Sequence, residues 1–112
     1  MSTAERTTID EALIAEIVRR ILTVTQPDRV ILFGSAATGQ MTRDSDIDLL
    51  VVLDDPGDAL EESIRIRRSL RGLGYPFDVL IISTEWFEDS KGVIGGIAFP
   101  ANKYGRVIYA AA

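Results

Sequence analysis

The chain has 112 residues, of which 46% are hydrophobic, so it is expected to form one domain over residues 1–112 around a single core. It contains no cysteine and no histidine, which excludes disulfides, histidine-based catalysis and zinc sites built from these residues. The net charge of −5 disfavours direct nucleic-acid binding. We expect a cytoplasmic protein without a membrane segment, because the sequence has no cysteine, no secretory pattern and no apolar run long enough to cross a bilayer.

The first predicted element is an amphipathic helix over residues 8–25. Its apolar side chains recur every four residues, at Ile9, Leu13, Ile17 and Ile21. Thr8 and Glu11 have the spacing of a capping box, which predicts a helix start near Thr8. The helical pattern is then interrupted by Pro27 and Asp28.

Strands and helices are expected to alternate along the rest of the chain. Aliphatic and aromatic runs predict strands over residues 29–33, 47–53 and 76–82, and residues 105–109 fit a last short strand or a tail. The helices expected between them are a short turn over 35–38 that ends at Gly39, a helix over 59–71 that begins after Asp58, and a short helix capped by Ser83 or Thr84. The connection over 54–75 is long enough for a crossover helix, so the strands on either side of it are expected to run parallel. This order predicts an α/β (α+β) fold with helices packed on at least one face of a sheet.

Two carboxylates stand at the start of the most hydrophobic strand. Asp46 and Asp48 are two residues apart, so they point to the same face, which Leu50 and Val52 continue into the core. Like charges at this separation repel, whereas a bound dication turns the pair into a chelate, and oxygen ligands favour Mg²⁺ or Mn²⁺. Asp78 interrupts the third predicted strand and completes a three-carboxylate site if the two strands are neighbours.

A glycine and a serine end the first predicted strand. Gly34 allows close approach of the backbone to a phosphate, and Ser35 adds a hydroxyl donor at the start of a helical turn. Three acids without a histidine suit a two-metal phosphoryl-transfer site.

The spacing of these motifs resembles a known signature. Gly34-Ser35, ten residues and then Asp46-Ile47-Asp48 is similar to the signature of the DNA polymerase beta nucleotidyltransferase superfamily. The wider sequence FGSAATGQMTRDSDIDLLVVL resembles its minimal nucleotidyltransferase branch, often antitoxins paired with HEPN-domain toxins. Asp78 in FDVLII falls where the third acid of the family is expected, and the closing GRVIYA resembles the ends of these small proteins.

The resemblance implies a single small mixed sheet of the polymerase beta palm type and a Mg²⁺-dependent enzyme with ATP as substrate. Asp46 and Asp48 would bind both metal ions, and Asp78 would bind the catalytic metal and help to deprotonate the acceptor hydroxyl. Gly34 and Ser35 would hold the triphosphate. The implied reaction is transfer of AMP to an acceptor hydroxyl, which in related antitoxins is a tyrosine of the HEPN toxin, whose RNase activity the modification blocks.

Plainer interpretations of the acids remain. Asp44, Asp46 and Asp48 also fit a solvated acidic turn. Their spacing matches a calcium loop, but Leu49 stands where such a loop needs glycine. Asp78 also fits a strand residue that faces solvent.

Three other features of the sequence lie outside the candidate site. The uncharged run over 92–101 fits a partner-docking patch. Four arginines fit either a solvated helix face or a contact with triphosphate or RNA: Arg65, Arg67, Arg68 and Arg71. Four aromatic residues are expected in the core: Trp86, Phe87, Phe99 and Tyr104.

Two further functions compete with the enzyme that modifies a toxin. One is a binding module that neutralises its partner by occlusion, with a vestigial nucleotide site. The other keeps the enzyme but changes the acceptor to RNA or a small molecule. The sequence leaves open the nucleotide base, the acceptor residue and whether the protein forms homo- or hetero-oligomers.

Overall fold

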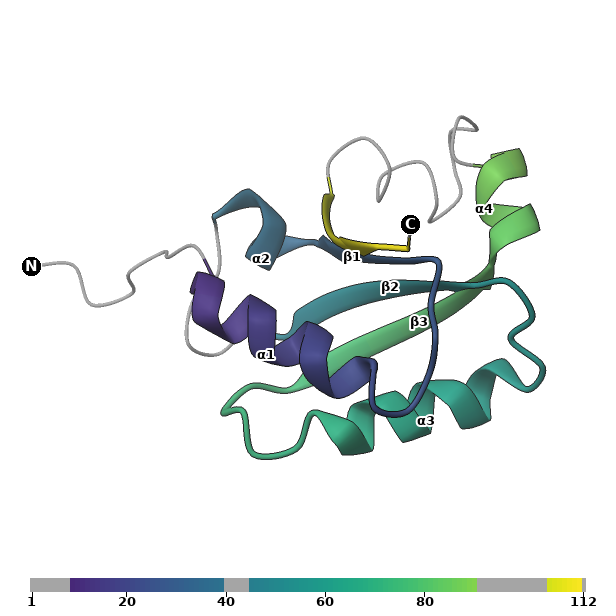
Figure 1. Cartoon of the computed structure of the whole chain (residues 1–112). Coiled ribbons are helices and arrows are strands. Elements are labelled where there is room, and N and C mark those ends of the chain that lie inside the picture. The colour runs from purple at the N-terminus through teal and green to yellow at the C-terminus, as the bar shows by residue number, and fades with distance from the viewer. Residues whose placement is uncertain (1–8, 40–44, 91–104, 112) are drawn as a thin grey trace, which may run out of the picture.

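A computed structural model describes residues 9–39, 45–90 and 105–111 (Figure 1). The three predicted strands are confirmed to within one residue: β1 (Arg29–Phe33), β2 (Ile47–Leu53) and β3 (Phe77–Ser83). Of the two expectations for residues 105–109, the structure shows the strand, β4 (Arg106–Ala110). The helices are α1 (Glu11–Ile21), α2 (Ser35–Thr38), α3 (Ala59–Ser69) and α4 (Thr84–Ser90). No helix in these ranges is long and apolar enough to cross a membrane.

Helix α1 is shorter than predicted at both ends. Its N-cap is Asp10, whose side chain accepts a hydrogen bond of 2.9 Å from the backbone N–H of Ala12. Glu11 is the first residue of the helix, and its carboxylate accepts two hydrogen bonds of 2.7 Å from Arg106 on β4. Thr8, the predicted start, lies outside the described residues. The helix ends at Ile21 and not at residue 25, with Leu22 as C-cap.

The other helix boundaries follow the predicted caps. Asp58 caps α3 by accepting a hydrogen bond of 3.1 Å from the N–H of Glu61, and the helix ends two residues earlier than predicted. Of the two candidates for the cap of α4, Ser83 accepts a hydrogen bond of 3.0 Å from the N–H of Trp86. Thr84 instead donates its hydroxyl proton to Asp28, which ties α4 to the residue before β1.

The four strands form one mixed sheet in the order β3-β2-β1-β4. Strand β1 is antiparallel to both of its neighbours, β2 and β4. Strands β2 and β3 run parallel, as predicted, with α3 as the crossover between them. Strand β2, which follows the Gly-Ser pair in the sequence, therefore lies in the interior of the sheet, between β1 and β3.

Both faces of strand β2 are covered by helices. Helices α1 and α3 pack on the face that receives Ile47, Leu49 and Val51 (Figure 1). The opposite face carries Leu50 and Val52, and these pack against α4 through Phe87. Burial on both faces explains why β2 is an almost continuous aliphatic run.

The aromatic residues are only partly where the sequence predicts them. Phe87 is fully buried, as predicted. The prediction for Trp86 is wrong, because 65% of this residue is exposed. One turn of helix cannot direct two successive side chains to the same face, and α4 directs Phe87 to the sheet. Phe99 and Tyr104, like the candidate patch over 92–101, lie outside the described residues.

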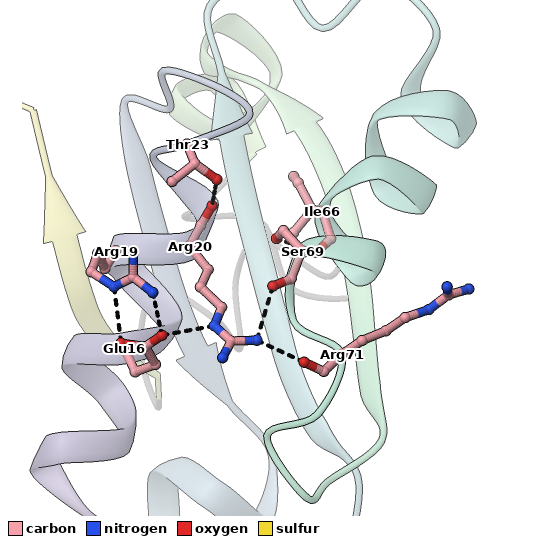
Figure 2. A network of polar contacts seen from close by, with 7 residues as sticks. All are labelled: Glu16, Arg19, Arg20, Thr23, Ile66, Ser69 and Arg71. Atoms are coloured by element: carbon pink, nitrogen blue, oxygen red, sulfur yellow. Dashed lines mark hydrogen bonds and ion pairs between the residues drawn. The ribbon is translucent and has the colours of Figure 1, made fainter.

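An arginine on α1 connects this helix to the end of α3 (Figure 2). Nη1 of Arg20 donates to the backbone carbonyls of Ser69 and Arg71, at 3.3 and 2.6 Å. The Nε of Arg20 donates to Glu16 at 2.7 Å, and Arg19 also donates to this carboxylate. Hydrogen bonds from Arg19 and Arg20 hold the pKa of Glu16 at about 2. Arg20 thus satisfies carbonyls that the end of a helix leaves without partners.

We expect Arg20→Met to lower the free energy of unfolding by about 1 kcal/mol, because the methionine keeps the apolar stem but removes the donors to the end of α3. Arg19→Met is the matched control, since within the described ranges the Arg19 side chain hydrogen-bonds to Glu16 alone, on the surface of the same helix. Urea unfolding of both variants measures the difference. Equal stabilities of the two variants would contradict a capping function for Arg20.

Candidate active site

The candidate site begins at the corner between β1 and α2. Gly34 has φ 69° and ψ −151°, a conformation that is essentially restricted to glycine. A Cβ atom on Gly34 would overlap Oδ2 of Asp48. Glycine is therefore needed twice here, once for the backbone turn and once for the approach of the carboxylate. Ser35, the first residue of α2, follows directly and is half-buried.

Strand pairing places Asp48 at this corner. In the antiparallel ladder Asp48 lies opposite Phe33, the last residue of β1. Phe33 packs against the apolar cluster formed by β1, β2, β3 and α4, and so gives Asp48 an apolar neighbour. The sequence indicates Phe33 only as a strand residue, because its position beside Asp48 depends on the register.

Asp48 and Asp78 are register partners in the parallel ladder between β2 and β3. Residues opposite each other in a ladder share a face of the sheet, so both carboxylates project on the face covered farther along by α4. Asp48 is half-buried, whereas Asp46 and Asp78 are exposed. The strands that carry Asp48 and Asp78 are thus neighbours, as the site requires, and Asp46 directly precedes the first of them. The solvent-facing interpretation of Asp78 is compatible with this position.

The acids influence one another electrostatically. The pKa of Asp48 is raised, first by its burial and then by the negative charges of Asp78 and Asp46. A divalent cation beside Asp48 would reverse this effect, and carboxylate oxygens are the donors that Mg²⁺ prefers. Within the ranges that the structure describes, however, no three acidic side chains are gathered closely enough to hold a metal ion. Metal coordination by all three residues therefore stays a prediction.

The mixed sheet, with Asp48 beside the Gly-Ser corner, has the nucleotidyltransferase fold. A sequence model of the nucleotidyltransferase domain matches residues 12–103, so the chain belongs to that family.

Solved structures show the same fold. A toxin–antitoxin structure determined with AMP-PNP is 19% identical, with a TM-score of 0.66 over 88% of this chain and 73% of the other. A candidate nucleotidyltransferase from Sulfolobus solfataricus is 20% identical, with a TM-score of 0.60 over 88% of this chain and 78% of the other. No curated protein sequence matches the chain.

We expect Gly34→Ala to destabilise the protein by at least about 2 kcal/mol, because the methyl group adds a steric overlap with Asp48 to the cost of the backbone conformation. Gly57→Ala is the control, since Gly57 also has a positive φ of 61° but a Cβ there meets no atom within 4 Å. Denaturant unfolding measures both.

Asp48→Ala should recover part of the stability that Gly34→Ala removes, because it deletes the carboxylate that the new methyl group overlaps. A double-mutant cycle over these two positions therefore gives a favourable coupling energy. Additive effects would contradict the contact between Gly34 and Asp48.

Without divalent cations, Asp48→Asn should raise the midpoint of thermal unfolding at neutral pH. The folded pKa of Asp48 lies above its ordinary value, so the stability from this group is present at low pH and lost as pH rises through the raised pKa. Thermal unfolding with a chelator across pH 4–8, compared with the exposed control Asp55→Asn, tests this. The advantage of Asp48→Asn should vanish toward the acid end, and an advantage that is independent of pH would contradict it.

Proposed function

We propose that the protein is a Mg²⁺-dependent nucleotidyltransferase that transfers AMP from ATP to a hydroxyl group of a partner protein. The observation that carries the proposal is the contact of Asp48 with the Gly34 corner while Asp78 is its register partner on the next strand. The site thus combines a corner that suits a phosphate with carboxylates that suit a metal ion.

Each site residue has a proposed function in this reaction. Asp46 and Asp48 bind two Mg²⁺ ions, which offset the charge of the triphosphate and of the leaving pyrophosphate. Asp78 binds the catalytic ion and helps to accept the proton of the attacking hydroxyl. Gly34 and Ser35 hold the triphosphate through backbone amides and the serine hydroxyl.

We propose a HEPN-domain toxin as the partner and a tyrosine hydroxyl as the acceptor, so that the protein acts as an antitoxin. The support is the family resemblance of the sequence and the structural similarity to a toxin–antitoxin determined with AMP-PNP. The exposure of Asp78 is compatible with this acceptor, because a macromolecule can approach that carboxylate from solvent.

Neutralisation by occlusion is the second candidate. It is favoured by one observation, namely that the acids in the described ranges are not gathered around a metal position. An enzyme and an occluding module differ in whether neutralisation depends on the carboxylates. RNA and small molecules remain alternative acceptors of the enzyme.

The test is to incubate the protein with Mg²⁺, ATP labelled in its α-phosphate, and the toxin encoded by the neighbouring gene. Label should move to the toxin, and Asp46→Asn, Asp48→Asn or Asp78→Asn should each lower the rate at least about a hundredfold. Asp89→Asn, at an exposed position of α4, is the control. ATP with Mg²⁺ should also raise the unfolding midpoint of the wild type.

The two candidates give opposite results in this assay. Neutralisation of the toxin that survives Asp46→Asn and Asp48→Asn, without any transfer of label, supports occlusion and overturns the enzyme. Label on RNA or on a small molecule, with none on the toxin, would keep the enzyme and change the acceptor.

A further inference from the structure

Helix α3 and the turn before it have an unusually uneven charge distribution. Five acids lie at the start of this segment, at Asp54, Asp55, Asp58, Glu61 and Glu62. Four arginines follow at the other end, at Arg65, Arg67, Arg68 and Arg71. In a chain with a net charge of −5, this arginine-rich end stands out as a local positive surface.

Most of these charges are not neutralised within the molecule. Arg65 is paired with Glu62 at 2.9 Å. Within the described ranges, Glu61, Arg67, Arg68 and Arg71 make no ion pair. Figure 2 shows the backbone carbonyl of Arg71 turned toward Arg20, while the Arg71 side chain points away from Arg20.

The same side of α3 carries apolar groups. Leu60 is 69% exposed, and Ile64 stands one turn farther along and is half-buried. Ile64 and three arginines line a hollow of about 250 Å³: Arg67, Arg68 and Arg71. We call this surface, from Leu60 through Arg71, the outer face of α3. The opposite side of the helix faces the sheet and carries the buried residues Ser63, Ile66 and Leu70.

We propose that the outer face of α3 is an interface between two copies of the chain, which pair antiparallel about a two-fold axis near Ile64. The outer face carries Leu60 and Glu61 at one end, Ile64 in the middle and arginines at the other end, so it is complementary to itself when one copy is turned end for end. In such a pair, Leu60 of each copy enters the hollow beside Ile64 of the other.

The charges then find partners across the axis. Glu61 and Arg68 are seven residues apart, nearly two helical turns, so they lie on the same flank of the outer face but about 10 Å apart along it. They are too distant to pair within one chain. In the antiparallel arrangement, Glu61 of each copy meets Arg68 of the other, which makes two equivalent ion pairs.

The size of the helix limits the strength of this dimer. Helix α3 has 11 residues and is therefore about 16 Å long, which gives an interface at the small end of specific contacts. The association is weak and falls with added salt, because exposed ion pairs are screened. It leaves the carboxylates accessible, since Asp48 and Asp78 project from the opposite face of the sheet. The proposal is therefore independent of the proposed function.

The test uses sedimentation equilibrium of the full chain from about ten micromolar to about one millimolar. The wild type should dimerise in a salt-dependent manner. Glu61→Arg and Arg68→Glu should each weaken the homodimer at least about tenfold, because each places two like-charged pairs across the axis. Asp89→Arg on α4 makes the same charge change as Glu61→Arg outside the interface and should leave dimerisation unchanged.

Mixing the two variants gives the decisive measurement. In a heterodimer of Glu61→Arg with Arg68→Glu, both cross-axis pairs are again of opposite charge, so the mixture should dimerise as tightly as the wild type. A wild type that stays monomeric, a dimer insensitive to both reversals, or a mixture that stays monomeric would each overturn the proposal. Far-UV circular dichroism of each variant shows that α3 remains folded.

Discussion

Asp48 lies where a strand that is buried on both faces reaches water, and its carboxylate is confined there by two neighbours. On one side it lies against Gly34, where a Cβ atom would overlap the Asp48 carboxylate. On the other side, the parallel ladder brings Asp78 into register on β3. Burial and the two other acids raise the pKa of Asp48, so the folded protein holds negative charge in a place that disfavours it. A divalent cation bound beside Asp48, as proposed for this site, would offset this cost.

The rest of the fold fixes the position of β2. Helices α1 and α3 bury one face of the strand, and Phe87 of α4 buries the other. Contacts between elements distant in the sequence hold these layers together, such as Arg20 on the end of α3 and Arg106 on Glu11. Since the strand cannot shift without exposing one of these faces, the carboxylate at its start is held relative to the Gly-Ser corner.

The molecule separates its two charged surfaces. The carboxylates of the site lie on the α4 face of the sheet, whereas the arginines of α3 lie beyond the opposite face. Helix α3 makes this separation possible, because it connects the parallel strands β2 and β3 across one face of the sheet. A protein with one small sheet can therefore carry an acidic site on one side and a positive surface on the other.

The sequence by itself determined the alternation of strands and helices, the caps at Asp58 and Gly39, and the acids at the mouth of the central strand. These features depend on side chains close in sequence, through hydrogen bonds over a few residues or through the two-residue period of a strand. The start of α1 lies three residues later than predicted, because Asp10 caps the helix. The exposure of Trp86 depends on which side of α4 meets the sheet. Only the tertiary structure decided that Asp48 lies against Gly34 and in register with Asp78, because strand order and register arise from packing across the whole chain.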